Sequence, residues 1–381
     1  MVNRHYQIMT NKNKSNMISC RCLILCLVGI FVLDTIFFHY LIQWGRDSLN
    51  RRQIRLAVID DVELNTDRSD QISSNADVRS RATFWGQFPL TIKGSVGKPT
   101  IPKIIHQTWD TEDIPETFHR WIVTWKRLHP DWSYWFWTLK EIRRFVAKEY
   151  PEFLNLYDLY TEDIFRSDVM RYLVLYKYGG IYVDLDMEAL KPLDIWTHNF
   201  NCIVSEETYE HPFVVREADP PANIVNGFIA CRPGHPFLKS AIDSLEEFAG
   251  FYFGDYLHAT GPFFLDAVLE RYLIKMQNAS HMRSDSVDIT IVPPKYFFPT
   301  YDPSESDLIT GRCFPGAYQL LKEPAKITCK ELLKTFLRRT PGVDSYTDHH
   351  WVHAYMFHPD WKKKNTKLIT EIVPSAITKH V

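Results

Sequence analysis

The sequence predicts an α/β domain with a mainly parallel sheet that begins near residue 100. Three short apolar runs have the length and composition of buried strands, at residues 103–108, 132–137 and 181–185. Segments whose apolar residues recur at helical spacing separate these runs, and glycine or proline marks several of their ends. Strands that alternate with helices in this way are typical of a parallel sheet built from helical crossovers.

The first two strand–helix units lie between residues 103 and 149. Thr138 and Glu141 form a capping-box pattern, which predicts that a helix starts there. In chain order the expected elements are a strand at 103–108, a helix at 118–128, a strand at 132–137 and a helix that runs from 138 towards 149.

The next unit leads to a pair of aspartates. Asp163 is expected to cap a helix, and Gly179-Gly180 is expected to end it, because glycine readily adopts the left-handed conformation of a helix C-terminus. The strand at 181–185 follows, so Asp184 and Asp186 fall at its carboxyl end. Ligands of open α/β sheets bind beyond the carboxyl ends of the strands.

Two carboxylates separated by one residue can converge on a divalent cation where a strand opens into a loop. Hard oxygen ligands suit Mg²⁺ or Mn²⁺, which keep positions open for phosphate oxygens. When a nucleotide-sugar donates its sugar, the leaving group is a nucleoside diphosphate. Such a cation would neutralise the charge that develops on this leaving group. The alternative interpretation of Asp184 and Asp186 is a solvated acidic turn.

Asp168 and Arg171 lie three residues apart in the preceding helix, hence on one face, which is expected to be opposite its apolar stripe. As an ordinary surface ion pair they would contribute about 0.2–0.5 kcal/mol. As a functional pair they would grip sugar hydroxyls near the cation. The aromatic residues concentrated between Trp121 and Tyr182 suit the apolar faces of sugar rings, although core packing also explains them.

Composition and the N-terminal segment restrict the class of protein. A formal net charge of −2 argues against a nucleic-acid binder. Residues 22–42 are apolar enough to span a bilayer as an uncleaved signal anchor. We therefore expect a single-pass type II membrane protein facing the Golgi or ER lumen. Its expected parts are a cytoplasmic tail (1–21), the anchor (22–42), a stem (43–99), a catalytic domain (100–363) and a C-terminal tail (364–381).

The cysteines and one sequon fit a lumenal domain. Four cysteines lie beyond the anchor, and three pairings are possible, of which Cys313 with Cys329 is favoured (Cys202, Cys231, Cys313, Cys329). Cys20, Cys22 and Cys26 lie in or beside the anchor, where they are either palmitoylated or apolar filler. Asn278-Ala279-Ser280 is a glycosylation sequon.

Two segments resemble glycosyltransferase family 32: IPKIIHQTW (101–109) and RSDVMRYLVLYKYGGIYVDLDM (166–187). Asn226-Gly227-Phe228, Thr260-Gly261-Pro262 and the terminal His349-His350-Trp351 resemble further blocks of the family. The resemblance implies a GT-A type, Rossmann-like nucleotide-sugar-binding domain and retention of anomeric configuration.

The resemblance also implies roles for individual residues. Asp184 and Asp186 would bind the metal and the donor, and His349 or, as second choice, His350 would complete the coordination. Asp168 and Arg171 would hold the donor sugar. The remaining expected donor-binding residues line the nucleotide pocket or follow it (Ile105, His106, Gln107, Thr108, Asn226).

Within this family the segments look most similar to the mannosylinositol-phosphoceramide branch. The resemblance therefore implies a mannosyltransferase that uses GDP-mannose, Mn²⁺ or Mg²⁺, and a lipid or glycan acceptor such as a sphingolipid. A UDP-hexose-dependent α-1,4-galactosyl- or N-acetylglucosaminyltransferase stays open, as does a non-catalytic sugar-binding protein. A haloacid-dehalogenase-type phosphatase is disfavoured, because Glu188 stands where that motif needs Thr or Val.

Overall fold

The computed structural model describes residues 100–216, 224–252, 254–278, 289–314, 316–335, 337, 340–354, 361 and 365–380. The expected cytoplasmic tail, membrane anchor and stem lie outside these residues, as do Ala279 and Ser280 of the sequon. Among the residues described, no helix combines the length and apolarity that a bilayer-spanning segment needs.

The centre of the domain is a six-stranded sheet whose strand order is β3-β1-β4-β7-β6-β8. The pairs β1–β3, β1–β4 and β6–β8 are parallel, whereas β7 runs antiparallel to both β4 and β6. The expected α/β fold is confirmed, and three of the five strand pairs follow the expected parallel arrangement. The strands are β1 (Ile104–Trp109), β3 (Ser133–Thr138), β4 (Gly180–Val183), β6 (Cys202–Glu206), β7 (Ile224–Cys231) and β8 (Thr290–Val292).

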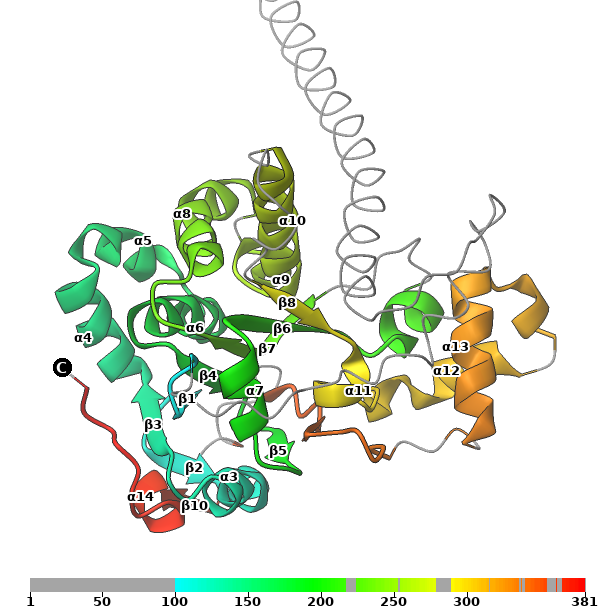
Figure 1. The fold of residues 1–381 in the computed structure, drawn as a ribbon, viewed down its shortest axis with the longest axis horizontal. Helices are drawn as coiled ribbons and strands as arrows, with labels where there is room; N and C mark the ends of the chain where they lie inside the picture. The colour runs from blue at the N-terminus through cyan, green and yellow to red at the C-terminus, as the bar shows by residue number, and fades with distance from the viewer. Residues whose placement is uncertain are drawn as a thin grey trace, which may run out of the picture. The chain divides into compact units, whose positions relative to one another are not determined.

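Helices cover both faces of this sheet. In the view of Figure 1, α4, α6, α8 and α10 lie on one side and α3 on the other. The larger helices are α3 (Glu116–Leu128), α4 (Leu139–Glu149), α6 (Asp163–Tyr178), α8 (Pro236–Phe251) and α10 (Pro262–Asn278). Shorter ones are α5 (Leu154–Leu159), α7 (Asp194–Asn199), α9 (Tyr256–Ala259), α11 (Pro294–Phe297) and α14 (Ile369–Ile372), with 3₁₀ turns η1 (Pro151–Phe153), η4 (Pro303–Glu305) and η5 (Tyr318–Leu320).

The local elements confirm most of the expected boundaries. The Thr138 side chain accepts a hydrogen bond from the Glu141 N–H, as the capping-box pattern predicts. Gly179 ends α6 with φ +65°. The expected cap at Asp163 is wrong: Glu162 occupies the cap position without a side-chain bond, and Asp163 is the first helical residue, where its charge still favours the helix N-terminus.

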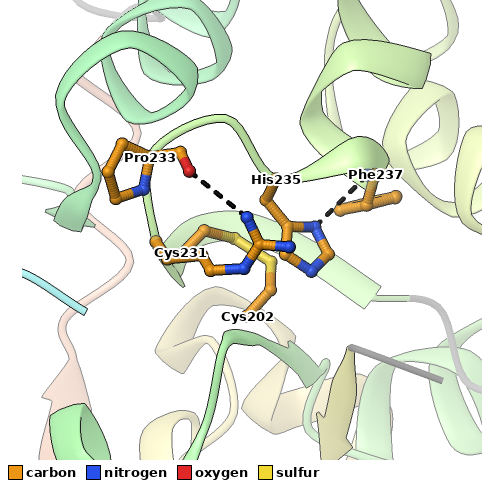
Figure 2. Close-up of a disulfide and its surroundings, with 6 residues drawn as sticks. Cys202, Cys231, Pro233, His235 and Phe237 are labelled. Carbon is orange, nitrogen blue, oxygen red and sulfur yellow. Dashed lines mark hydrogen bonds between the residues drawn. A yellow bond between two sulfur atoms is a disulfide. The ribbon is translucent and has the colours of Figure 1, made fainter. Parts of the chain in front are cut away.

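A lobe beside the sheet is formed by α12 (Ser306–Cys313), α13 (Glu323–Lys334) and the π-helix η2 (Glu210–Val215). These elements enclose a small hydrophobic core of their own, and Cys313–Cys329 links α12 to α13. A second disulfide, Cys202–Cys231, joins β6 to β7 beside His235 and the start of α8 (Figure 2). The favoured pairing of Cys313 with Cys329 is confirmed.

The segment expected as a C-terminal tail packs onto the domain from residue 365 onward. Strand β10 (Thr366–Leu368) pairs antiparallel with β2 (Asp113–Pro115). The backbone N–H groups of Phe136 and Ile377 bond across to Ile377 and Tyr134, and the His380 ring stacks on Trp137 at 3.9 Å. Residues 365–380 therefore belong to the fold, and they cover the outer edge of the sheet along β3.

Candidate functional site

Gly179 and Gly180, at the junction of α6 and β4, let this strand enter the sheet beside β1. Gly180 has φ +101°, and a Cβ atom there would stand 2.6 Å from the Ile104 carbonyl oxygen. A Cβ atom on Gly179 would stand 2.6 Å from Cδ of Pro233. Both positions therefore require glycine, which lets the start of β4 lie close against β1. The strand then leads to Asp184 at its carboxyl end.

Asp184, Asp186 and His349 come together just beyond β4. One ligand atom from each of the three side chains lies within 4.8 Å of the others. The histidine arrives through a small antiparallel sheet, in which β5 (Met187–Ala189) pairs with β9 (Thr347–His349) and places Met187 opposite His349. The side chains of the three residues are 29%, 13% and 12% exposed, so the group is shielded yet open to solvent.

Neighbouring donors hold both carboxylates in place. The Tyr182 hydroxyl donates to Oδ1 of Asp184 at 2.7 Å, and the Val352 N–H donates to Oδ2 of Asp186 at 2.8 Å. Nε2 of His349 lies 3.1 Å from Oδ1 of Asp186. Outer contacts of this kind orient metal ligands. The two carboxylates and the imidazole form a donor set that fits Mn²⁺ or Mg²⁺.

The electrostatics of the group reflect burial and close opposite charges. Burial raises the pKa of Asp184, although the Arg171 guanidinium opposes this shift. Burial acts in the same direction on Asp186, but His349 and the Val352 N–H outweigh it, so the pKa of Asp186 is lowered. Burial would lower the pKa of His349, yet the Asp186 and Asp184 charges outweigh it and raise the pKa.

Asp168 and Arg171 form a buried ion pair behind Asp184. The interpretation as an ordinary surface ion pair is wrong: both residues are 3% exposed, because β7 and α8 pack against α6. Nη2 of Arg171 lies 3.0 Å from Oδ1 of Asp168 and 3.6 Å from Oδ1 of Asp184. The guanidinium also stacks over the Tyr182 ring at 4.4 Å.

Further donors complete the surroundings of Asp168. Asn226 Nδ2 donates to its Oδ1 at 2.9 Å, and Thr260 Oγ1 donates to its Oδ2 at 3.0 Å. Burial raises the pKa of Asp168 to about 6, while Arg171 and the two hydrogen bonds limit the rise. The Asn226 carbonyl accepts a bond from Arg171 at 2.6 Å. In this arrangement the buried Asp168–Arg171 pair helps to hold the Asp184 carboxylate through Arg171.

Gly227 keeps room for the Asp184 carboxylate, which leads to a prediction. A Cβ atom at this position would stand 2.7 Å from Oδ2 of Asp184, whose other oxygen is held by Tyr182. We expect Gly227→Ala to displace the carboxylate, weaken Mn²⁺ binding about tenfold and destabilise the fold by about 1–3 kcal/mol, the usual range for overpacking.

Isothermal titration with Mn²⁺ and chemical denaturation of the purified chain measure the two effects. The control is Gly250→Ala in α8, where no atom lies within 4 Å of an added Cβ. It is expected to leave Mn²⁺ binding unchanged. Unchanged Mn²⁺ affinity in Gly227→Ala would show that Asp184 does not bind the cation.

The residues expected to line the nucleotide pocket are buried in β1. Ile105, His106 and Gln107 are at most 1% exposed, and Thr108 is 8% exposed. Their polar side chains serve the fold: His106 Nε2 donates to the Gly179 carbonyl, and its Nδ1 accepts from Trp137 Nε1. Burial lowers the pKa of His106 to about 3. Gln107 donates to the Asp184 backbone carbonyl. Strand β1 therefore helps to position the site through the backbone at the end of the neighbouring strand β4.

His350, the second choice as a metal ligand, points elsewhere. Its ring stacks on Trp121 at 4.2 Å, and its Nε2 lies 3.2 Å from Oε2 of Glu188. Only its backbone approaches the group, through an N–H bond to the Asp186 carbonyl at 2.9 Å. Tyr182, Gly227, Thr260 and Val352 are parts of the site to which the sequence pattern assigned no individual role.

Residues 115–208 match a family model described as a glycosyltransferase sugar-binding region containing a DXD motif. Asp184, Leu185 and Asp186 form such a motif, and they lie within the matched segment. The resemblance to glycosyltransferases inferred from the sequence is thereby confirmed.

Several curated relatives are named as mannosyltransferases. The chain is 42% identical over 174 residues to inositol phosphoceramide mannosyltransferase 3 of Schizosaccharomyces pombe. This alignment covers 44% of this chain and 44% of that protein. It is 24% identical over 317 residues to an initiation-specific alpha-1,6-mannosyltransferase of Candida albicans, covering 72% and 81% of the two chains. The chain spans about half the length of the first three curated relatives that it matches.

Among solved structures, a PaToxG glycosyltransferase aligns with 61% of this chain and 84% of its own length. The alignment has 16% sequence identity and a TM-score of 0.36.

Proposed function

We propose that this chain is a metal-dependent, retaining glycosyltransferase with a GT-A type domain, which transfers mannose from GDP-mannose to a lipid or glycan acceptor. The observation that carries the proposal is the convergence of Asp184, Asp186 and His349 beyond the carboxyl end of β4. This is the part of an α/β sheet where nucleotide ligands bind. The similarity to proteins named as mannosyltransferases supports the choice of sugar.

The three side chains would hold Mn²⁺ or Mg²⁺, which would supply positive charge for the departing diphosphate. The chain's own contribution is to keep this group rigid. Tyr182 and Arg171 hold one oxygen of Asp184, and the Val352 N–H holds one oxygen of Asp186. Rigid ligands stabilise developing charge without reorganising during the reaction.

Arg171 also balances the negative charge of the site. Without a cation, Asp184 and Asp186 would repel each other, and Arg171 and His349 offset that repulsion within 3.6 Å and 3.1 Å respectively. The donor sugar is proposed to lie beside Asp184, which the buried Asp168–Arg171 pair supports. A membrane anchor at residues 22–42, and with it a lumenal location, stays part of this proposal.

Donor-dependent thermal unfolding tests the proposal. The full-length chain in detergent is heated with GDP-mannose, UDP-galactose, UDP-N-acetylglucosamine or no nucleotide, each with Mn²⁺ and with EDTA. A ligand at one hundred times its Kd stabilises the folded state by about 2.7 kcal/mol. We expect an increase in Tm with GDP-mannose that requires Mn²⁺.

Each outcome has a distinct meaning. Stabilisation by a UDP-sugar alone would retain the transferase mechanism and replace the donor. Equal stabilisation in EDTA would contradict the metal-dependent mechanism. No response to any donor would favour a sugar-binding protein that takes up no nucleotide-sugar.

A further inference from the structure

A buried chain of polar residues runs from the end of β6 to the segment that follows His349, residues 350–354. It contains Glu207, His211 and Asp302, which are 8%, 5% and 6% exposed. Glu207 directly follows β6, and His211 lies in the π-helix η2 of the disulfide-linked lobe. Ionisable side chains are rarely buried to this extent without specific partners, so the pattern of their bonds defines what they do.

The bonds of His211 fix its protonated nitrogen. Its Nε2 accepts the backbone N–H of Asp302 at 2.9 Å. An N–H group can only donate, so this nitrogen carries the lone pair and the proton of the neutral ring lies on Nδ1. Nδ1 then donates to Oε1 of Glu207 at 2.9 Å. Arg216 pairs with both oxygens of Glu207 and keeps that carboxylate charged.

His211 is linked to the segment that follows His349 by two sets of contacts. The first is ring contact: the His211 ring meets the Trp351 ring edge-to-face at 4.7 Å, and Trp351 lies 4.1 Å from the His349 ring. The second runs through Asp302, whose backbone is held by His211 and whose carboxylate accepts a bond from His353 Nε2 at 2.5 Å.

The backbone of the Trp351–His353 segment is strained. Trp351 has φ +53° and His353 has φ +52°, a left-handed conformation that bulky residues seldom adopt. Between them lies Val352, whose N–H donates to Asp186. Strained residues of this kind persist only where the surrounding structure holds them, and they cluster at functional sites. Here the His211 ring contacts Trp351 and the Asp302 carboxylate accepts a bond from His353, so both strained residues are held from outside their own segment.

We propose that His211, with its tautomer fixed by Glu207, is a positioning residue for the metal group. It holds the Trp351–His353 segment in the conformation that directs the Val352 N–H to Asp186 and sets the orientation of His349. The lobe formed by η2, α12 and α13 thus acts on the metal group through His211. This inference rests on the proposed metal-dependent function.

Two substitutions of His211 that differ in side-chain length provide the test. His211→Gln can place its amide oxygen near the position of Nε2 and keep an acceptor for the Asp302 N–H, whereas the shorter His211→Asn cannot reach it. Mn²⁺ affinity of the full-length chain is measured by electron paramagnetic resonance of the free ion, without donor or acceptor. We expect His211→Asn to raise the Kd for Mn²⁺ by about 10–100-fold, as is typical of outer contacts of a metal site, and His211→Gln by less than about threefold.

Two further variants separate positioning from general destabilisation. His211→Phe keeps the ring against Trp351 but removes the acceptor, and we expect a loss of Mn²⁺ affinity similar to that of His211→Asn. His129→Phe is the matched control, because His129 is also buried, bonded through Nδ1 to the Trp125 carbonyl, and accepts the Leu193 N–H at Nε2. We expect it to lower Tm and to leave the Kd for Mn²⁺ unchanged, because the hydrogen-bond partners of His129 are Trp125 and Leu193 and not residues of the metal group.

The outcomes distinguish this inference from the proposed function. If the unaltered chain binds no Mn²⁺, the metal-dependent function fails. If it binds Mn²⁺ and the Asn and Gln variants bind it equally well, or lose affinity equally, the positioning role of His211 is wrong. Should His211→Asn fail to fold, comparison of His211→Phe with His211→Gln at equal folded fraction gives the same decision.

Discussion

Asp186→Asn is expected to abolish sugar transfer and to leave the fold almost unchanged. Asparagine has the same shape, and its amide oxygen can still accept the Val352 N–H bond that Asp186 makes at 2.8 Å. The substitution removes one negative charge from the Asp184, Asp186 and His349 group. We expect transfer to fall by about a thousandfold or more, beyond the 10–100-fold typical of losing an outer contact of a metal site.

Transfer of labelled mannose at saturating Mn²⁺, together with Tm, measures this effect. The matched comparison is His349→Ala against His350→Ala, because adjacent histidines differ in what they face: His349 lies at Asp186, and His350 lies at Glu188. His349→Ala should lose most activity, and His350→Ala should retain most of it. Normal turnover in Asp186→Asn would falsify the metal assignment, whereas the reverse order of the histidines would move the third ligand to His350.

Local sequence patterns predicted the strands β1, β3 and β4, the helices α3, α4 and α6 and the acidic motif, because each depends on a few adjacent residues. The capping bond of Thr138 and the helix end at Gly179 are determined within four residues of the chain. Asp184 and Asp186 lie on one short segment, so their convergence follows from the geometry of a strand end.

Long-range pairing was beyond such patterns. His349 meets Asp186 across 163 residues, through the register of β5 against β9. Only the family resemblance pointed to the terminal histidines, and it left two candidates. The preference for His349 agrees with its position in the group, while its role as a ligand stays a prediction.

The burial of Asp168 and Arg171 was misjudged for a related reason. Helical spacing shows which residues share a face of α6, but it does not show what packs against that face. Tertiary contacts with β7 and α8 enclose the helix more completely than its apolar stripe indicates. A charged pair three residues apart in a helix usually lies in solvent, and here its burial is the feature that sequence spacing alone could not reveal.

Burial of this pair makes Arg171→Met the second substitution with a large expected effect. The guanidinium lies 3.0 Å from Asp168 and 3.6 Å from Asp184, and all its surroundings are protein. Its removal leaves the Asp168 charge buried and uncompensated, which typically destabilises a protein by about 3–5 kcal/mol. Chemical denaturation of the full-length chain measures this loss, and we expect donor-dependent stabilisation to be lost as well.

The double variant Asp168→Asn with Arg171→Met separates stability from function. Removing both charges eliminates the uncompensated carboxylate, and the amide oxygen of the introduced asparagine can still accept a bond from Asn226 or Thr260. We expect at least half of the lost unfolding free energy to return, since replacing a whole buried pair is often nearly neutral. Transfer should stay low, because Asp184 still lacks the guanidinium that faces it. Full recovery of both properties would show that the pair only stabilises the fold, and that Asp184 needs no support from α6 to bind the metal.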